Sequence, residues 1–399
     1  MIMDDTLQHQ RIKIVAYWHD PRFSRKQGGL IRMFELADNL TRGGHEIQLF
    51  LPRLGYPREQ TIAEVIQIPF IGLSFIRPLS FQVACNLALF FRMSRRIDAV
   101  YVRQMNSCLP LLIARIFRVT CIYELSNDPF LAYEKLGIIR RTFEKFMDRS
   151  SIRLANKVVV LSEWSKERLS RLGGVPAPKI AVMPSGADLD LFRPMDKTEC
   201  RTNLKLDPSL LYIGFIGSFH VDQGIDYLID AAPSILSRNN DVRFLLVGDG
   251  PASGPWRKKV EELRLGEVFI FSGLVNYRSV PEYIGAMDIC VAPHSPSTNQ
   301  ASPVKLFDYM ACRRPIVASN IEVVRQIVEE CGCAILVEPA DTDALADGII
   351  TLLDDEGMRD SMADRGLRHV VDNYNRKKAA DDLIRIINEK RESNYRQEK

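Results

Sequence analysis

The sequence predicts an α/β protein built from two doubly wound, parallel domains. Short apolar runs alternate with segments of helical periodicity through most of the chain, which is the pattern of repeated strand–helix–strand units. At 399 residues the chain exceeds the size that one hydrophobic core usually supports. A mixed-charge linker over residues 194–206 divides it, so we expect one domain in residues 1–194 and a second in residues 195–372.

Composition narrows the class of protein. With 46% hydrophobic and 26% charged residues, the chain has the make-up of an ordinary globular protein. Its apolar runs are shorter than the ~18 residues that a membrane-spanning helix needs, and the polar start is unlike a secretory signal. The cysteines form no CxxC pair, and Cys331-Gly-Cys333 is too isolated for a zinc site. We therefore expect a cytoplasmic, reduced protein without a metal centre.

Charge is distributed unevenly along the chain. Residues 1–195 hold 28 Lys and Arg against 18 Asp and Glu, whereas the remainder holds 25 against 32. A basic half beside an acidic half indicates that one domain meets an anionic partner. Anionic lipid headgroups are the first candidate for that partner, and nucleic acid is not expected.

The first domain opens with a strand over residues 12–18, a loop, an amphipathic helix and a second strand over residues 45–52. This order is a βαβ unit. Gly28 and Gly29 stand at the entrance of the helix, where a backbone without side chains lets a ligand approach closely. A plain tight turn would explain the same glycine pair.

Two segments of the first domain have two explanations each. Residues 68–93 are rich in Phe, Leu and Ile and carry only two arginines, and residues 136–157 form a basic amphipathic helix. Each segment could cover the sheet as an ordinary helix. Each could equally lie on an anionic membrane, with its apolar side in the lipid and its basic residues at the surface.

The later strands of the first domain end in polar residues. A strand that starts at residue 120 runs into a loop where Glu124, Asn127 and Asp128 lie within reach of a ligand. A further strand ends at Ser162, which is the expected N-cap of the next helix.

The second domain begins with a strand over residues 211–217. The loop after it contains Ser218, His220 and Gln223, and its glycines do not spell a dinucleotide fingerprint, so NAD is not expected. His220 is a candidate donor of a hydrogen bond to phosphate. A histidine that merely stands at a helix entrance would look the same.

Two more strands of this domain end in glycine turns. The strand that starts at Val242 ends at Gly248, and the next ends at Gly273 with Leu274 and Val275 after it. In open parallel sheets ligands bind outside the carboxyl ends of the strands, so these turns are candidate ligand contacts.

The segment over residues 293–320 is the most informative one. A polar loop follows an apolar strand and leads into a helix predicted over residues 301–312, with Ser302 as N-cap. Lys305 and Asp308 lie three residues apart on the same side of this helix. A helix N-terminus with a lysine suits a diphosphate, and a carboxylate can bond a ribose hydroxyl. A capped helix whose polar side faces water would explain the same residues.

This segment resembles the donor-binding signature of the family 4 retaining glycosyltransferases, which have the GT-B fold. In that family a Glu, seven residues and a second Glu precede an apolar run. Here Gln300 and Asp308 hold the two acidic positions, and the sequence YMACRRPIVAS follows. The run from Lys157 to Pro194 also resembles the family, at the point where the chain leaves the first domain.

The resemblance implies two Rossmann-like domains that face a central cleft. It implies a nucleoside-diphosphate sugar as donor, a glycan or lipid-linked acceptor, retention of anomeric configuration, and no cofactor or metal. It also implies that a C-terminal helix over residues 373–390 crosses back onto the first domain, and that a patch on the first domain contacts the inner face of a membrane.

The same resemblance implies roles for individual residues. Lys305 would hold the diphosphate, Asp308 the ribose, and Gln300 the donor sugar, while the backbone over residues 273–275 would contact the base. The other residues expected at the donor are Gly28, Gly29, Ser218, His220, Gln223, Gly248, Ser302 and Val304.

The chain departs from the family at several positions. Gln300 and Asp308 replace the two Glu residues of the motif. Ser218 and Gln223 stand where the family has the Arg and Lys that clamp the diphosphate, and Ser126 or Asn127 stands near the position of a frequent His. No general base is evident; Asp128 and Asp20 are the candidates on the first domain.

These departures leave alternatives open. The chain could be a catalytically degenerate glycosyltransferase-like subunit that binds lipid or protein, or another GT-B enzyme such as a sugar-nucleotide epimerase. Release of nucleoside diphosphate from a donor sugar distinguishes an active transferase from a degenerate subunit.

Overall fold

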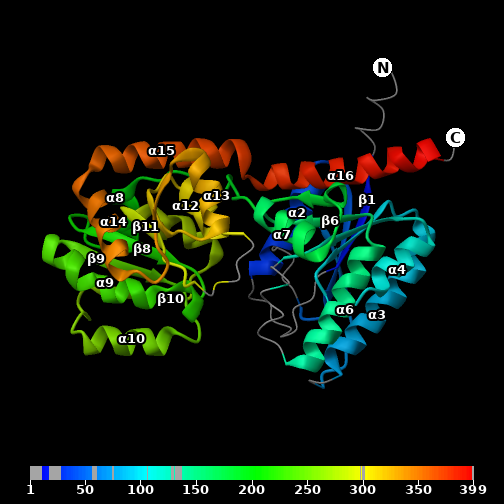
Figure 1. Cartoon of the computed structure of the whole chain (residues 1–399), viewed down its shortest axis with the longest axis horizontal. Coiled ribbons are helices and arrows are strands. Elements are labelled where there is room, and N and C mark those ends of the chain that lie inside the picture. The colour runs from blue at the N-terminus through cyan, green and yellow to red at the C-terminus, as the bar shows by residue number, and fades with distance from the viewer. Residues whose placement is uncertain are drawn as a thin grey trace, which may run out of the picture. The chain divides into compact units, whose positions relative to one another are not determined.

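The computed structural model describes residues 11–17, 28–55, 61–73, 76–105, 107–126, 130, 137–296, 298 and 302–397. The chain forms two compact units (Figure 1). The first unit combines Met1–Ser185 with Arg376–Lys399, and the second is Gly186–Asn375. The chain therefore passes into the second unit at Gly186, earlier than the boundary after Pro194 that the sequence predicts.

The first unit contains a seven-stranded parallel sheet in the order β3-β2-β1-β4-β5-β6-β7. Its strands are β1 (Lys13–Tyr17), β2 (Glu46–Pro52), β3 (Glu64–Ile68), β4 (Ala99–Arg103), β5 (Thr120–Glu124), β6 (Lys157–Val160) and β7 (Ile180–Val182). The central strands are buried on both faces, which explains why they read as continuous apolar runs in the sequence.

Helices cover both faces of this sheet (Figure 1). They are α2 (Gly28–Arg42), α3 (Arg77–Arg92), α4 (Leu109–Ile116), α6 (Ile138–Leu154), α7 (Glu163–Gly173) and α16 (Arg376–Gln397). One core contains residues of α2 and α16, and the other contains residues of α3 and α4. Short 3-10 helices lie at Met93–Arg95 and Ala177–Lys179.

The C-terminal helix returns to the first unit, as the resemblance implies. Leu383 and Ile387 of α16 are fully buried in the core that also holds Leu40 of α2. The helix begins at Arg376, slightly later than the predicted start at residue 373, because α15 (Glu356–Asn373) occupies that position.

The second unit contains a six-stranded parallel sheet in the order β10-β9-β8-β11-β12-β13. Its strands are β8 (Leu211–Ile216), β9 (Val242–Val247), β10 (Phe269–Gly273), β11 (Ile289–Ala292), β12 (Ile316–Ser319) and β13 (Ala334–Val337). Both units are thus doubly wound α/β domains, and the predicted fold class is confirmed.

The helices of the second unit pack on both faces of its sheet. They are α8 (Lys197–Asn203), α9 (Ile225–Arg238), α10 (Ser253–Glu262), α11 (Val280–Ala286), α12 (Val304–Ala311), α13 (Glu322–Cys331), α14 (Thr342–Asp354) and α15. Residues of α9, α10 and α14 share one core, and residues of α11, α12 and α13 share the other. Short 3-10 helices lie at Val221–Gln223 and Tyr277–Ser279.

Helix capping follows the sequence at one of the two predicted sites. The Ser162 hydroxyl accepts a hydrogen bond from the Ser165 amide, and the Asp341 carboxylate caps α14 in the same way through the Ala344 amide. The prediction at Ser302 is wrong: α12 begins at Val304 with Pro303 as its N-cap, so Ser302 lies before the cap. Proline at that position fixes the backbone itself and leaves the serine outside the helix.

Each sheet has one point where the strand order reverses. In the first unit this point lies between β1 and β4, and in the second it lies between β8 and β11. Ligands of open α/β sheets bind outside the carboxyl ends of the strands at such a point. Within the part of the chain that the structure describes, none of the helices is both long and apolar enough to cross a bilayer.

Candidate functional site

The loops at the carboxyl ends of β8, β9 and β11 are packed against one another without room for side chains. Gly224 has φ +68°, and a Cβ atom on it would lie 1.6 Å from the carbonyl oxygen of Pro293. Gly248 has φ +138°, and its Cβ would lie 1.9 Å from the carbonyl oxygen of Gly217. Glycine is therefore required at both positions to bring these loops together at the reversal point.

Helix α12 is fixed to this point by the side chains of its first turns. The Tyr309 hydroxyl accepts a hydrogen bond of 2.9 Å from the Ile216 amide at the end of β8. One turn earlier, the Lys305 ammonium donates a hydrogen bond to the Gln223 side-chain oxygen and lies 4.0 Å from the centroid of the Phe215 ring. These contacts aim Lys305 at the loop that follows β8.

The surroundings of Lys305 bring the pKa of its amine close to neutral pH, so the amine readily gains or loses a proton. Burial lowers the pKa of its amine to about 7, although the Asp222 carboxylate opposes the shift. The loop that the sequence predicts to hold a diphosphate is thus contacted by a lysine whose protonated form is stabilised by added negative charge. An anionic ligand would supply that charge.

Asp308 lies on the same helix as Lys305 and belongs to a second polar group. Its Oδ1 atom is buried and has no hydrogen-bond partner among the described residues. Burial raises the pKa of Asp308 well above its usual range, and the Asp188 carboxylate adds to the shift. The pKa of Tyr277 is raised by burial, by Asp308 and by Asp188, so these three side chains lie close together.

The other residues that the sequence predicts to contact the donor sugar nucleotide differ in their burial and contacts. Gln223 is buried and hydrogen-bonded to Lys305, while the side chains of Ser218 and His220 are exposed. Gly248 donates a hydrogen bond of 3.0 Å to the carbonyl of Gly273. This bond joins the ends of β9 and β10.

Leu274 and Val275, which follow β10, and Val304, which begins α12, are more exposed than Gln223. Leu274 is 69% exposed, Val275 is half-buried, and Val304 is 37% exposed. The Ser302 hydroxyl is buried without a partner in the described part of the chain, although Ser302 does not cap α12.

His294 was not singled out from the sequence, yet it lies at this point. The ring is fully buried, and neither ring nitrogen has a hydrogen-bond partner within the described structure. Burial and the nearby Lys305 charge lower the pKa of His294 well below its usual range, whereas the Asp222 backbone opposes them. A histidine directly after an apolar strand was the only sequence signal for it.

In the first unit, a buried ionic network lies at the carboxyl ends of β4 and β5. Glu124 is fully buried, and its carboxylate lies 3.3 Å from the Arg32 guanidinium and 3.2 Å from the Arg103 guanidinium. Burial raises the pKa of Glu124, but the two guanidinium groups and the hydrogen bonds from Tyr101 and Ser126 together outweigh burial, so the net pKa is lowered. The Tyr101 hydroxyl donates a further hydrogen bond to this carboxylate.

The same network includes the predicted glycine pair. The Arg103 guanidinium donates a hydrogen bond of 2.7 Å to the carbonyl of Gly29, and Gly28 and Gly29 form the first residues of α2. The sequence indicated Glu124 but missed Arg32 and Arg103. An arginine at the end of an apolar strand was the available signal for Arg103.

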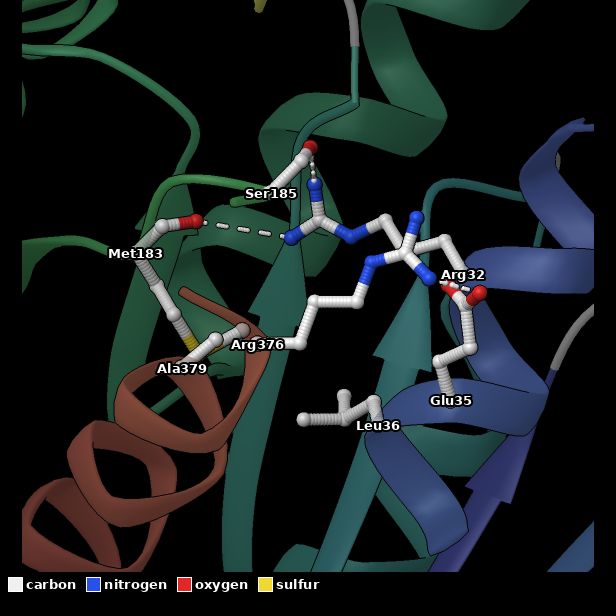
Figure 2. A pocket seen from close by; sticks show the side chains of 7 residues that line it. All are labelled: Arg32, Glu35, Leu36, Met183, Ser185, Arg376 and Ala379. Atoms are coloured by element: carbon white, nitrogen blue, oxygen red, sulfur yellow. Dashed lines mark hydrogen bonds and ion pairs between the residues drawn. The ribbon is translucent and has the colours of Figure 1, made fainter. Parts of the chain in front are cut away.

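A small pocket lies beside this network (Figure 2). It is lined by Arg32, Glu35, Leu36, Met183, Ser185, Arg376 and Ala379. Figure 2 shows the Arg32 guanidinium facing the Ser185 hydroxyl and the Met183 carbonyl, and the Arg376 guanidinium facing Glu35. Burial and the Arg32 charge lower the pKa of Arg376 to about 9.

The residues that line the pocket therefore hold two segments of the chain against α2. Arg32 and Glu35, which lie three residues apart on α2, hold the segment after β7 and the start of α16 respectively. Both held segments belong to the first unit.

Four predicted residues lie outside the described chain. They are Gln300, Asn127, Asp128 and Asp20. The contact of Gln300 with the donor sugar, the position of Asn127 near a ligand, and Asp128 and Asp20 as candidates for a general base stay predictions. Across the described residues, no group of three or more His, Cys, Asp or Glu side chains could hold a metal ion.

Two family models match the chain. The model of Glycosyltransferase Family 4 matches residues 26–191, and the model of Glycosyl transferases group 1 matches residues 211–355. The first match lies mostly in the first unit and the second lies within the second unit.

Individual relatives are also glycosyltransferases. The chain is 26% identical to alpha-D-kanosaminyltransferase of Streptomyces kanamyceticus over 288 residues, which cover 70% of this chain and 73% of the relative. It is 22% identical to an uncharacterised glycosyltransferase of Methanocaldococcus jannaschii over 393 residues, which cover 94% and 97% of the two chains.

Solved structures resemble the whole fold. A glycosyltransferase from Rickettsia africae gives a TM-score of 0.78 at 17% identity and covers 96% of this chain and 99% of its own. HepE from Anabaena in complex with UDP-glucose gives 0.74 at 18% identity and covers 96% and 100%. At these identities the likeness concerns the fold alone.

Proposed function

The chain belongs to the family 4 and group 1 glycosyltransferases with the GT-B fold, and on that basis we propose its reaction. A sugar moves from a nucleoside-diphosphate sugar to a hydroxyl of a glycan or lipid-linked acceptor. The anomeric configuration is retained, and no metal or other cofactor is required.

The observation that carries the donor assignment is the position of Lys305. It lies at the reversal point of the second sheet and contacts the loop that follows β8. Transfer of the sugar leaves negative charge on the departing diphosphate, and a fixed cation in a buried site stabilises that charge more than water does. In this proposal Lys305 supplies that cation.

The loss of the usual Arg and Lys does not leave the diphosphate without partners. Gln223 stands at one of these positions and already bonds Lys305, so a bound diphosphate would replace this bond with a charge-assisted one. A Cβ atom on Gly217 would lie 3.5 Å from the Lys305 ammonium, so glycine at this position keeps a side chain out of the space that a phosphate oxygen needs beside that ammonium.

Asp308 is assigned to the ribose of the nucleotide. A carboxyl group with a raised pKa can donate as well as accept a hydrogen bond, and a ribose hydroxyl does both. The buried Oδ1 atom of Asp308 without a partner in the described chain is the feature that supports this role.

The nucleotide itself is proposed from chemistry and from similar proteins. HepE from Anabaena has been solved in complex with UDP and in complex with UDP-glucose. A nucleoside diphosphate sugar is the donor class proposed here, and UDP is the first nucleotide to test.

The acceptor is proposed to be presented at an anionic membrane surface, on the inner face of the membrane. Helices α3, α4 and α6 follow one another in contact, and their outer side carries large exposed apolar side chains. These are Leu79, Val83, Leu87, Phe90, Phe91, Leu109, Leu112, Ile116, Ile138, Ile139, Phe143 and Phe146. We call them the apolar surface.

Basic residues accompany the apolar surface. Helix α6 alone carries Arg140, Arg141, Lys145, Arg149 and Arg153 against two acidic residues. Apolar side chains that enter the lipid boundary with basic residues at the headgroups are the features of an interfacial surface.

The test is nucleotide binding followed by turnover. The purified chain is titrated with UDP, GDP and ADP by calorimetry, and the nucleotide that binds is then supplied as its sugars with lipid-linked acceptors. The proposal expects micromolar binding of one nucleotide, and release of that nucleotide together with a glycosylated acceptor. Binding of none of the three, or release of none from any donor, would contradict it.

A further inference from the structure

Two cysteines outside the candidate site lie in direct contact. Cys331 ends α13 and Cys333 immediately precedes β13, and their sulfur atoms are 2.7 Å apart and hydrogen-bonded. Gly332 between them has φ +59°, a left-handed conformation that turns the chain back and places both thiols on the same side. All eight cysteines are free thiols in the structure, and this is the one pair in mutual contact among those described.

The two thiols differ in exposure. Cys331 is half-buried, whereas Cys333 is 1% exposed. Apart from Cys331, only Cys108 among the eight cysteines is more than marginally exposed. Cys331 is therefore the member of the pair that a molecule in solution can reach.

The hydrogen bond between the two thiols favours the reactive form of the outer thiol. The hydrogen bond with Cys333 lowers the pKa of Cys331, the nearby Arg365 charge lowers it further, and burial and the Glu330 charge oppose them. Arg365 is held in place because its guanidinium donates hydrogen bonds of 2.9 and 2.6 Å to the Gly332 carbonyl. A thiolate at a partly exposed position beside an arginine is the usual state of a reactive cysteine.

The inner thiol is held at a fixed position in the core. A Cβ atom on Gly366 of α15 would lie 3.3 Å from the Cys333 Cβ and 3.2 Å from the Met310 Cγ. Cys333 thus packs where α15 also meets α12, and it cannot move away from Cys331 without disturbing that contact.

We propose that Cys331 and Cys333 form a reversible intramolecular disulfide, with a small-molecule disulfide such as glutathione disulfide as the oxidant. This property is independent of the proposed transferase reaction. In a reducing compartment such a pair is oxidised only transiently, which is the behaviour of a redox-responsive site.

The reaction proceeds by two thiol–disulfide exchanges. The Cys331 thiolate attacks one sulfur of glutathione disulfide, the sulfur–sulfur bond breaks, and one glutathione thiolate leaves. The Cys333 thiolate then attacks the Cys331 sulfur of this mixed disulfide and releases the second glutathione. The two cysteines lose two protons and two electrons, and glutathione disulfide takes them up as two glutathione thiols.

The order of attack also follows from the pair. The hydrogen bond with Cys331, burial and the Cys331 charge all raise the pKa of Cys333. Once Cys331 is bound to glutathione, neither its charge nor that hydrogen bond remains, and of these three causes burial alone still raises the pKa. Cys333 then ionises more readily and closes the disulfide.

The test uses the whole chain in glutathione buffers that range from fully reduced glutathione to mostly glutathione disulfide. Samples are quenched with acid and alkylated, and the peptide that holds both cysteines is weighed by mass spectrometry. The proposal expects this peptide to lose both alkylatable thiols in the oxidising buffers and to regain them with reductant, while the other six cysteines stay alkylatable.

Variants separate the two roles. Cys333→Ser should trap Cys331 as a stable glutathione adduct, whereas Cys331→Ser should leave Cys333 unmodified because it is buried. Cys108→Ser, which removes the other half-exposed thiol, should oxidise as the unchanged protein does. Retention of both thiols in glutathione disulfide by the unchanged protein would overturn the proposal, whether or not the variants fold.

Discussion

The charge of the Lys305 amine depends on the groups that surround it. Burial disfavours the ammonium form, and the Asp222 carboxylate restores it only in part, so the pKa of the amine stands at about 7. A diphosphate close to the amine would raise this pKa, and binding would take up a proton wherever the free protein is deprotonated.

Donor affinity should therefore fall as pH rises. Between pH 7 and 9 the affinity for the nucleoside diphosphate should drop by up to about tenfold per pH unit, because the free protein must gain a proton to bind. Titration calorimetry across this range measures the slope, and Lys305→Met should abolish it. An affinity in the unchanged protein that does not vary with pH would contradict the prediction.

Removal of the same amine should slow the reaction. We expect Lys305→Ala to lower kcat by about 10²-fold or more, since the leaving diphosphate loses its fixed cation. Lys258→Ala is the matched control, because Lys258 is an exposed lysine of α10 in the same unit. Steady-state kinetics with saturating donor measure both variants, and an unchanged kcat for Lys305→Ala removes this lysine from the reaction.

Glu124 is the counterpart of Lys305 in the first unit, since it is a fully buried charge held by its neighbours. Replacement by Gln should cost about 3–5 kcal/mol of unfolding free energy, because Arg32 and Arg103 would remain charged and buried without their shared carboxylate. Urea unfolding at pH 7 measures the loss.

The lowered pKa of Glu124 sets the direction of a pH effect on stability. A carboxyl whose folded pKa lies below its unfolded value stabilises the protein above the unfolded pKa, and this stabilisation is lost as pH falls through the folded pKa. The difference between the unchanged protein and Glu124→Gln should therefore shrink in acid. A difference that persists at low pH would contradict the assignment.

At the scale of elements, the donor-side loops depend on glycine rather than on side-chain chemistry. Gly224→Ala should destabilise the second unit by at least about 2 kcal/mol, because the Cβ would overlap the Pro293 carbonyl and φ is positive. Gly254→Ala is the control, since a Cβ there meets nothing within 4 Å and the residue lies in α10. Thermal unfolding followed by circular dichroism compares the two, and equal melting temperatures would contradict this reading.

The sequence predicts elements well where hydrophobic periodicity specifies them. Strands such as β1, β2 and β8 and helices such as α2 follow from apolar runs and their spacing, and α7 starts at the residue that capping chemistry indicates. The order of the strands is not contained in these runs and comes from the structure. Helix α12 starts later than predicted, because a proline cap and a serine cap compete at adjacent positions and pattern alone does not rank them.

The candidate site is only partly readable in the same way. Lys305 and Gln223 are far apart in sequence, and only their resemblance to a family motif suggested a shared ligand before the structure joined them. Arg32 and Arg103 escaped notice because they share a partner, Glu124, that is distant in sequence. His294 escaped notice because its burial near Lys305 appears only in the folded chain. Long-range pairing of this kind leaves no local pattern in one sequence.

At the scale of the whole molecule, the apolar surface predicts how the protein binds to lipid vesicles. We expect the protein to bind vesicles that contain anionic lipid, and to bind them less as salt rises, because basic residues accompany the apolar side chains. Vesicle flotation at low and high salt measures this, and equal binding to neutral and anionic vesicles would argue against it.

One variant pair localises the vesicle binding. Phe91→Ser removes a side chain of α3 that is 72% exposed and should weaken binding several-fold with little effect on folding. Leu263→Ser removes an exposed leucine of the second unit and should leave binding unchanged. Similar losses in both variants would indicate general hydrophobic adsorption.

The chain enters the second unit once and leaves it once, at positions that are themselves joined. The Ala187 amide donates a hydrogen bond of 2.7 Å to the Tyr374 carbonyl, so the first and last residues of this unit are held together within the unit itself. A gene fragment that encodes residues 186–375 should therefore yield an autonomous nucleotide-binding protein. The complementary piece that ends at residue 185 lacks α16 and with it Leu383 and Ile387 of its core, so it should stay insoluble until that helix is supplied as a separate peptide.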